Sequence, residues 1–249
     1  MKISVDEHVA SIALVSGADA SPVNFASTEL EPPVIAFFDL DRTLIDGYSL
    51  TALAWQQIFT LRMSVPRFIK LSIMFSKYGL GQLSYAEMLE ATIDDIKGMP
   101  EQNLIDLAQE SYEQRLKHWI YRDGFELVQS HKKRGHHVVL VTSATSYQSS
   151  AIAELFGFDQ VYCTELEIVD ERIAGGVAPC YGAGIVARGY CTEVGGDLSN
   201  AYFYSDSPDD MPLLEQVGHP VVVNAKKKLA KLIEGRNWPA IQFDKKGLP

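Results

Sequence analysis

Residues 34–43, VIAFFDLDRT, decide the fold. The first five, VIAFF, form an unbroken run of apolar β-forming residues, which is the pattern of a strand that a parallel sheet buries on both faces. Two carboxylates, Asp39 and Asp41, follow this run directly. Ligands of open α/β sheets bind at the carboxyl ends of the strands, so the residues that end a buried strand are the first candidates for a functional site.

The same apolar pattern returns further along the chain, and helical stretches separate the runs. The runs are 137–141, 201–204 and 220–223, and the helical stretches are 124–133, 147–156, 211–217 and 226–234. Strands that alternate with helices in this way predict an α/β fold with a doubly wound parallel sheet. Residues 166–177, LEIVDERIAGGV, have the character of a hairpin with its turn at Asp170-Glu171.

Residues 49–121 interrupt the alternation. They contain apolar residues at helix spacing, no strand pattern, and breaks near 64–66, 78–81 and 98–100. We therefore expect a helical domain at 49–121, inserted between the two parts of a core domain at 34–48 and 122–249. Residues 1–33 are rich in Ser, Ala and acidic residues and end in two prolines, which predicts a flexible N-terminal tail.

The composition excludes several classes of protein. The 249 residues include 22 Lys and Arg against 32 Asp and Glu, a net charge of −10. Binding to nucleic acid needs clustered positive charge, so this balance argues against it. The most apolar region, residues 50–80, is interrupted by basic side chains, and no stretch is long enough to span a membrane. Three cysteines without a CxxC pair favour a reducing cytoplasm over a disulfide framework or a zinc site.

Three of the predicted strands end in acidic or hydroxyl residues. Asp39 and Asp41 follow the first strand, Thr142 and Ser143 follow the second, and residues 205–210, SDSPDD, follow the third. A single aspartate at a strand end is usually a helix cap or turn former. A cluster of carboxylates at one edge is different, because the groups repel one another unless a cation neutralises them, and hard oxygen ligands suit Mg²⁺.

On these motifs the chain resembles the haloacid dehalogenase (HAD) superfamily of hydrolases, most closely the subfamily IB that includes the phosphoserine phosphatases. The similarity runs from about residue 34 to the C-terminus, and the segment AYFYSDSPDDMPLLEQVGHPVVVNA at 201–225 is especially characteristic. The resemblance implies a Rossmann-like core with an inserted helical cap of the C1 type.

The resemblance also implies a role for each motif residue. Asp39 matches the nucleophile, Asp41 the general acid and base, and Thr142 the hydroxyl of the second motif. Thr142 and the backbone N–H of Ser143 would then hold the phosphoryl oxygens. The implied Mg²⁺ ligands are Asp39, Asp41 through its backbone carbonyl, Asp206 and, from behind, Asp210. This scheme is physically consistent, because a carboxylate approaches a phosphate dianion only when positive charge neutralises both. Attack by Asp39 would give an aspartyl-phosphate and divide one difficult displacement into two easier ones.

The chain departs from the family at the third motif. Relatives carry a lysine there, commonly in a segment similar to GEGK, whereas residues 181–185 of this chain are YGAGI and place Ile185 at the lysine position. Arg188 lies one turn further along a helix that we expect to begin near Ala183. Two interpretations stay open: Arg188 supplies the missing phosphate-binding charge, or it is an ordinary exposed arginine.

The sequence therefore predicts a Mg²⁺-dependent phosphatase acting on a phosphomonoester of a small or partly apolar metabolite. The apolar and aromatic side chains at 55–75 are explained either by a helix face buried within the cap or by a pocket for an apolar leaving group, such as a lipid or isoprenoid phosphate. Asp46 stands loosely where phosphoserine phosphatases place a glutamate for the substrate amine. The alternatives are a catalytically weakened relative that binds a phosphorylated ligand or a protein partner, and a phosphotransferase.

Overall fold

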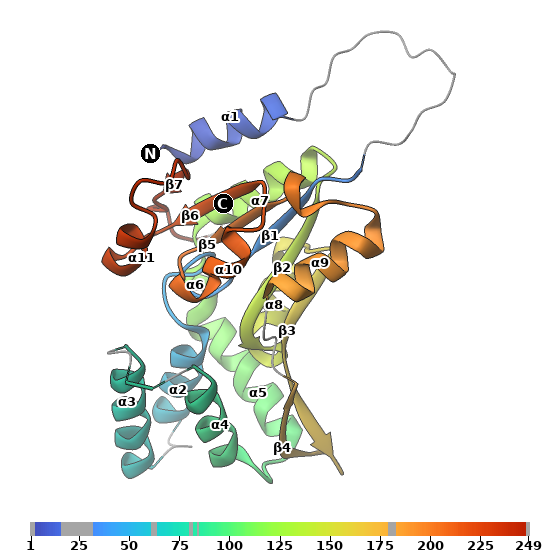
Figure 1. Ribbon diagram of the computed structural model, residues 1–249. Helices are drawn as coiled ribbons and strands as arrows, with labels where there is room; N and C mark the ends of the chain where they lie inside the picture. The colour runs from blue at the N-terminus through green and yellow to red at the C-terminus, as the bar shows by residue number, and fades with distance from the viewer. Residues whose placement is uncertain are drawn as a thin grey trace.

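The structure is a computed structural model, and it describes residues 3–15, 32–60, 64–79, 82–83, 85–178 and 183–247. A seven-stranded sheet with the order β4-β3-β2-β1-β5-β6-β7 forms its centre (Figure 1). Its strands are β1 (Ile35–Phe38), β2 (His137–Thr145), β3 (Gln160–Val169), β4 (Arg172–Ala178), β5 (Tyr202–Ser205), β6 (His219–Val223) and β7 (Ala240–Ile241). Among these seven described strands only the β3–β4 pair is antiparallel, so the predicted α/β fold with a doubly wound parallel sheet is confirmed.

Helices cover both faces of the sheet, which explains the unbroken apolar run in β1. The core helices are α7 (Arg122–Lys133), α8 (Ser146–Phe156), α9 (Ala183–Val194), α10 (Met211–Leu214) and α11 (Lys227–Leu232). Ala36 and Phe38 pack in the cluster that contains α7 and α8 side chains. Ile35 and Phe37 point the other way and pack in the cluster of α9 and α10. Because successive side chains of a strand alternate between faces, a strand covered on both sides is apolar at every position.

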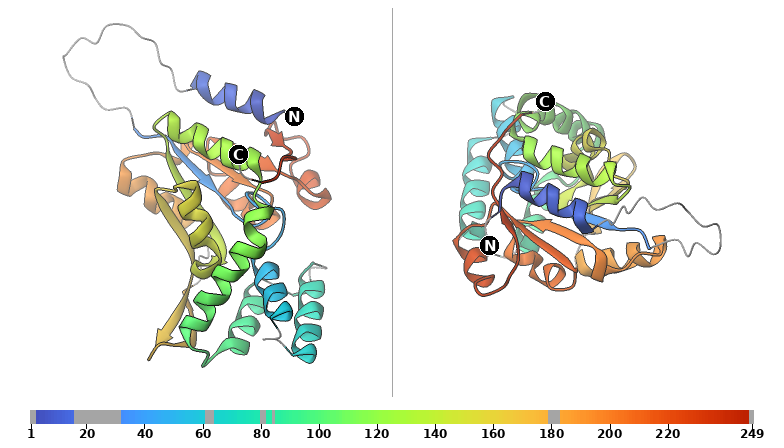
Figure 2. Two further views of the ribbon diagram at one scale, coloured as in Figure 1. Left: turned by 180° about the vertical axis from the view of Figure 1, so that it is seen from behind. Right: turned by 90° about the horizontal axis from the view of Figure 1, so that it is seen from above.

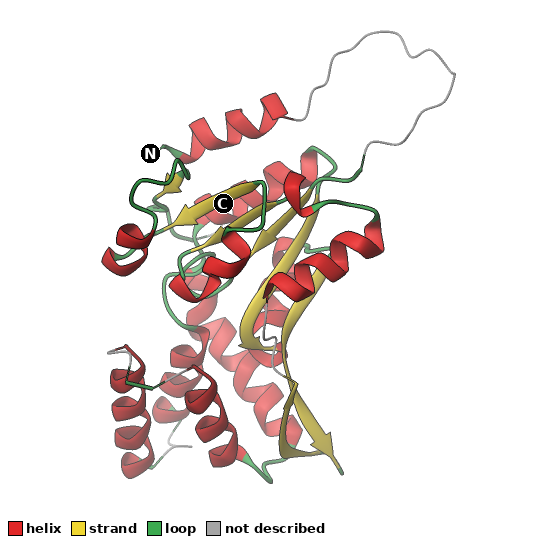
Figure 3. Ribbon diagram, viewed as in Figure 1, coloured by secondary structure: helices red, strands yellow, loops and turns green. Residues whose placement is uncertain are grey.

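The segment between β1 and α7 is helical. The elements that the structure describes in it are α2 (Ser49–Phe59), α3 (Val65–Gly79), α4 (Tyr85–Ile96), α5 (Glu101–Ser111), the π-helix Tyr112–Leu116 and α6 (Lys117–Trp119). Helices α2, α3, α4 and α5 lie below β1 and β5 in the views of Figures 1 and 3. None of the described helices combines the length and apolar character needed to cross a bilayer.

Strands β3 and β4 continue past the sheet as a hairpin that packs on these helices. Asp170 and Glu171 form the turn with φ angles of 49° and 59°, the left-handed conformation at both central positions that tight hairpin turns favour. This confirms the predicted hairpin. Its packing was not predicted: Leu166 and Ile173 join a buried cluster with side chains of α2, α4 and α5. The Ile173 backbone N–H also donates to the carbonyl of Met99 at 3.0 Å.

The prediction of a flexible tail at 1–33 is wrong for residues 5–15, which form helix α1 (Val5–Val15) against the core beside α7 (Figure 2). His8 is 3% exposed, and its Nε2 lies 2.9 Å from the Tyr204 hydroxyl. Arg134 donates to the carbonyl of Val9 at 3.0 Å. The sequence gives little sign of this docking, because the groups that α1 contacts, both polar and apolar, lie far away along the chain. The rest of the expected tail, residues 16–31, lies outside the described residues.

A buried chain of imidazoles continues from His8 into the core. The Tyr204 hydroxyl lies 2.8 Å from His131 Nε2, and His131 Nδ1 lies 2.8 Å from His136 Nδ1. Burial lowers the pKa of His8 and of His136 to about 4, and lowers the pKa of His131 well below its usual value. The three rings are therefore neutral at pH 7. Tyr204 also stacks on Phe38, the residue before Asp39, with 4.6 Å between ring centroids.

Candidate active site

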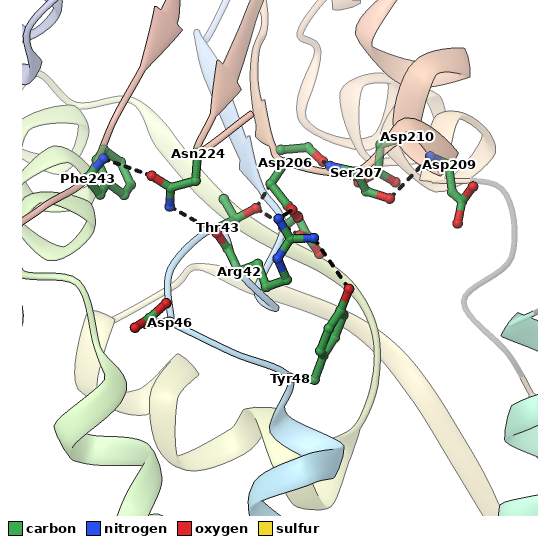
Figure 4. A network of polar contacts seen from close by, with 12 residues as sticks. Arg42, Thr43, Asp46, Tyr48, Asp206, Ser207, Asp209, Asp210, Asn224 and Phe243 are labelled. Atoms are coloured by element: carbon green, nitrogen blue, oxygen red, sulfur yellow. Dashed lines mark hydrogen bonds and ion pairs between the residues drawn. The ribbon is translucent and has the colours of Figure 1, made fainter. Parts of the chain in front are cut away.

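The first and fourth motifs meet at the carboxyl edge of β1 and β5, where Figure 4 shows Arg42 and Thr43 beside Asp206. Strand pairing sets Phe38 opposite Tyr204, so the residues that follow in each strand reach the same edge. The backbone N–H of Asp39 donates to the Tyr204 carbonyl at 3.0 Å. The structure thus brings Asp39 and Asp206 together from positions that are far apart in the sequence.

Thr43 connects the two motifs directly. Its Oγ1 donates to Asp39 Oδ2 at 2.9 Å and accepts from the backbone N–H of Asp206 at 3.1 Å. The side chain is completely buried, so both bonds are shielded from water. Thr43, the final residue of the DxDxT pattern, therefore fixes the orientation of the Asp39 carboxylate. Its hydrogen bond goes to Oδ2 and does not involve Oδ1.

Asp41 lies at the start of the helical segment. Its Oδ1 accepts from the backbone N–H of Ser49, the first residue of α2, at 2.8 Å. A carboxylate is stabilised at a helix N-terminus by the exposed backbone N–H groups and the helix dipole. Burial raises the pKa of Asp41 to about 6, while the bond from Ser49 and the nearby charge of Arg42 act in the opposite direction.

Arg42 is a site residue that the sequence interpretation missed. Its Nη2 lies 2.8 Å from Asp206 Oδ2, in an ion pair whose aspartate is only 4% exposed. Arg42 has a φ of 63°, a left-handed conformation that is uncommon for a residue with a side chain. Asn224 stabilises it by donating from Nδ2 to the Arg42 carbonyl at 3.0 Å. Arg42 Nη1 also donates to the Tyr48 hydroxyl at 3.4 Å, on the side of the helical segment.

Asp210 completes the acidic cluster, and Asp209 does not belong to it. Ser205 Oγ donates to Asp210 Oδ2 at 2.5 Å within the short turn that follows β5. Asp209 is exposed, and Figure 4 shows its carboxylate directed away from Asp206. Its backbone N–H donates to Ser207 Oγ at 3.1 Å, which is an ordinary turn contact.

The cluster is electrostatically strained without added positive charge. Burial, followed by the charges of Asp210, Asp206 and Asp41, raises the pKa of Asp39 well above its usual value. Burial likewise raises the pKa of Asp206 to about 7, against the opposing charge of Arg42, and the pKa of Asp210 to about 6. Several buried carboxylates with one guanidinium among them form a site that favours an additional cation.

The donor set agrees with Mg²⁺, although the part of the chain that the structure describes contains no group of three His, Cys, Asp or Glu side chains arranged as a metal site. Mg²⁺ commonly takes only one or two protein carboxylates and keeps several waters. Asp39 and Asp206 supply hard oxygens of that kind. Asp206 Oδ2 is buried and has no hydrogen bond beyond its ion pair with Arg42, so it is a donor atom with spare capacity.

The predicted phosphate-binding residues of the second motif lie at the same edge. Leu140 of β2 pairs with Phe38 of β1. Thr142 follows Leu140 by two residues, as Leu40 follows Phe38, so it lies beside the first motif. Thr142 is buried, and its Oγ1 accepts from the backbone N–H of Ala144 at 3.1 Å. Ser143 is exposed. The expected strand end at residue 141 is wrong, since β2 continues to 145 through an irregularity in its pairing with β3.

In the described part of the chain, Arg188 contacts a glutamine outside the acidic cluster. Helix α9 begins at Ala183, as predicted, and Ile185 is 68% exposed on it. Arg188 donates to the Gln216 side chain instead. Among the described residues, no hydrogen bond or ion pair joins it to any of the aspartates named above. The first two residues of the third motif, 181–182, lie outside the described part of the chain.

Asp46 is also directed away from the site. The Tyr121 hydroxyl donates to Asp46 Oδ1 at 2.9 Å, and Lys246 forms an ion pair with Oδ2. Figure 4 draws no contact between this carboxylate and Arg42 or Asp206, although the charge of Arg42 helps to lower the pKa of Asp46. The suggestion that Asp46 receives a substrate amine is therefore not supported by its position.

The chain is similar to known proteins in both sequence and structure. A model of haloacid dehalogenase-like hydrolases matches residues 36–215. The "Inhibition of morphological differentiation protein" of Streptomyces azureus is 29% identical over 220 residues, which are 85% of this chain and 79% of that protein. A phosphoserine phosphatase of Mycobacterium tuberculosis is 30% identical over 237 residues, 90% of this chain and 76% of its own length. A Bordetella pertussis protein of unknown function has a similar structure, with a TM-score of 0.75, 27% identity and coverage of 84% of this chain and 98% of that one.

Proposed function

Because the chain belongs to the haloacid dehalogenase-like hydrolases, we propose that it is a Mg²⁺-dependent phosphatase that cleaves a phosphomonoester through an aspartyl-phosphate on Asp39. The observation that carries the proposal is the bridge through Thr43, which places the carboxylate of Asp39 against Asp206 from the neighbouring strand. The names of the phosphatase relatives support the same reaction.

The two steps follow from the positions of Asp39 and Asp41. Thr43 holds Oδ2 of Asp39, so the other carboxylate oxygen attacks phosphorus; the bond from phosphorus to Asp39 forms and the ester P–O bond breaks. Asp41 gives its proton to the departing alkoxide. Water then attacks the aspartyl-phosphate, Asp41 takes the proton of that water, and Asp39 and inorganic phosphate are released. The Ser49 N–H keeps Asp41 in position for both transfers.

Asp39, Asp206 and the backbone carbonyl of Asp41 would hold the Mg²⁺, with Asp210 behind them. When bound, the ion neutralises the carboxylates and the phosphate dianion so that they can approach each other. Thr142 and Ser143 are proposed to bind the phosphoryl oxygens, a role that their position at the same edge supports.

Arg42, rather than Arg188, is proposed as the cation that stands in for the lysine missing at Ile185. Arg42 already contacts the cluster through Asp206. Arg188 is exposed and occupied by Gln216. A guanidinium also matches a phosphoryl group by bidentate hydrogen bonding, which an ammonium group does not provide.

Residues 49–121 are proposed to be the cap that covers this site and selects the leaving group, together with the hairpin that packs on it. The substrate is then a small phosphorylated metabolite. Because Asp46 is held by Tyr121 and Lys246, a substrate without a critical amine agrees better with the site than phosphoserine. We propose the cytoplasm as the location, supported by a sequence with three cysteines and no CxxC pair.

A catalytically weakened relative that binds a phosphorylated ligand is the second candidate, because Ile185 replaces a charged residue. Turnover of 4-nitrophenyl phosphate separates the two functions. The proposal expects hydrolysis that needs Mg²⁺, stops in EDTA and is abolished in Asp39→Asn. Asp209→Asn is the matched control, since this aspartate points away from the cluster, and it should keep nearly full activity. Absence of turnover on a broad panel of phosphate esters would favour the binding function.

A further inference from the structure

Helix α3 exposes a row of apolar side chains. Val65, Ile69 and Ile73 are 70%, 52% and 52% exposed. They are spaced four residues apart and therefore lie in one line along the helix. Leu71 is buried on the opposite side, where α3 packs against α4. The exposed row is thus an outer face that no described element of the chain covers.

Helix α2 extends this apolar surface. Trp55 and Phe59 are 44% and 66% exposed, one turn apart, and the Trp55 ring lies 6.0 Å from both Phe59 and Phe68. We call Trp55, Phe59, Val65, Ile69 and Ile73 the cap patch. It holds five of the nine large apolar side chains that are exposed in the described parts of the chain. Soluble monomers usually expose such side chains singly, and a contiguous group marks an interaction surface.

The charge around the cap patch is opposite to that of the whole chain. Residues 47–86 contain no Asp or Glu and four basic residues, in a chain with a net charge of −10. Lys70 and Lys77 are exposed next to the apolar row. Asp95 of α4 pairs with Lys70 at 2.9 Å and with Arg67 at 3.8 Å. One carboxylate thus faces two cations of α3, and α3 itself keeps a positive balance, while α4 beside it also exposes Glu87 and Asp94.

We propose that the cap patch docks on an anionic lipid bilayer. A helix with an exposed apolar line flanked by lysines is the pattern of an interfacial helix, which lies in the headgroup region without spanning the membrane. Val65, Ile69 and Ile73 would enter the boundary of the acyl chains, while Lys70 and Lys77 would meet anionic headgroups. A second copy of this chain fits less well, because a two-fold contact would bring the same lysines of both copies to one interface, where their charges repel.

The test is flotation of the full chain with vesicles of phosphatidylcholine alone and of phosphatidylcholine with about a third phosphatidylglycerol. We expect binding to the anionic vesicles that weakens at high salt. Ile69→Glu with Ile73→Glu should reduce binding about tenfold or more, because two apolar side chains leave the bilayer. The matched control is Val169→Glu with Leu232→Glu, two exposed apolar residues outside the cap patch, and it should bind as the wild type does.

A second variant, which changes charge and adds no glutamate, keeps the proposal testable if the glutamate substitutions disturb folding. Lys70→Gln with Lys77→Gln keeps the apolar row and should still weaken binding to anionic vesicles, by roughly tenfold. Failure of the wild type to bind anionic vesicles at low salt would overturn the proposal. So would undiminished binding by both variants. A dimer in sedimentation equilibrium that Ile69→Glu with Ile73→Glu dissociates, without vesicle binding, would assign the patch to self-association instead. None of these measurements depends on phosphatase activity.

Discussion

Arg42 and Asp206 form an ion pair at the mouth of the acidic cluster, with 2.8 Å between Nη2 and Oδ2. This oxygen is the one that we propose as part of the metal site. In the protein without a phosphorylated ligand, the guanidinium and Mg²⁺ are therefore expected to compete for Asp206. When the ligand is bound, both cations are expected to stabilise its negative charge.

Arg42→Ala should separate metal binding from turnover. The variant loses a competing cation, so its affinity for Mg²⁺ in the absence of substrate should rise. Its kcat/KM should fall by about 10² to 10³, the usual cost of removing one electrostatic contact to a reacting group. Calorimetric titration with Mg²⁺ and steady-state kinetics measure the two effects. A variant with wild-type kcat/KM would show that Arg42 has no part in the reaction.

Arg188→Ala provides the comparison. Because Arg188 contacts Gln216 on the surface, we expect kcat/KM within about twofold of the wild type and little change in stability. The same assay with inorganic phosphate as inhibitor tests product binding. A loss comparable to that of Arg42→Ala would restore Arg188 as the substitute for the missing lysine.

Asp39→Asn should stabilise the metal-free protein. The pKa of Asp39 is raised in the folded state, so the folded protein binds its proton more tightly than the unfolded chain. The contribution of Asp39 to the free energy of unfolding is therefore fully present below the unfolded pKa of about 3.9. It is lost as the pH rises toward neutrality. Removing the charge should raise Tm in EDTA at pH 7 by roughly 2–4 °C per kcal/mol of repulsion removed. Thermal unfolding of Asp209→Asn is the control; its Tm should rise much less, because Asp209 is exposed and acts only on Asp210.

The docking of α1 should have the opposite dependence on pH. The pKa of His8 and of His136 is lowered to about 4, so these rings stabilise the fold fully above the unfolded pKa of about 6.5. Their contribution decreases as pH falls from about 6.5 to about 4. Hydrogen exchange of the amides of residues 5–15 should therefore accelerate over this range. His118→Asn, at an exposed histidine, should leave the profile unchanged; exchange in the wild type that does not vary with pH, apart from its chemical rate, would contradict the interpretation.

The pattern of apolar and turn residues within a short segment was enough to predict β1 and the hairpin turn. The apolar run of β1 follows from burial on both faces, and the turn at Asp170-Glu171 follows from the two short strand patterns around it. The convergence of Asp39 and Asp206 could also be predicted, because parallel strands in a doubly wound sheet deliver their carboxyl ends to one edge.

The features that sequence analysis missed depend on distant partners. Helix α1 docks through His8 on Tyr204, 196 residues away, and no periodicity within 1–33 indicates that contact. The conformation of Arg42 depends on Asn224, 182 residues further along. Asp46 was placed near the substrate by its distance from the first motif, but Lys246 at the other end of the chain holds its carboxylate elsewhere.

The central claim is that Asp39 is the nucleophile, and trapping its phosphoryl adduct tests it most directly. The Asp41→Asn variant should accumulate the adduct from 4-nitrophenyl phosphate and Mg²⁺, because 4-nitrophenolate leaves without an acid whereas the hydrolytic water needs a base. Acid quenching followed by peptide mass spectrometry locates the group. We predict a phosphoryl group on Asp39 that is absent without Mg²⁺; turnover with no adduct at Asp39, or with the adduct on another residue, would contradict the mechanism.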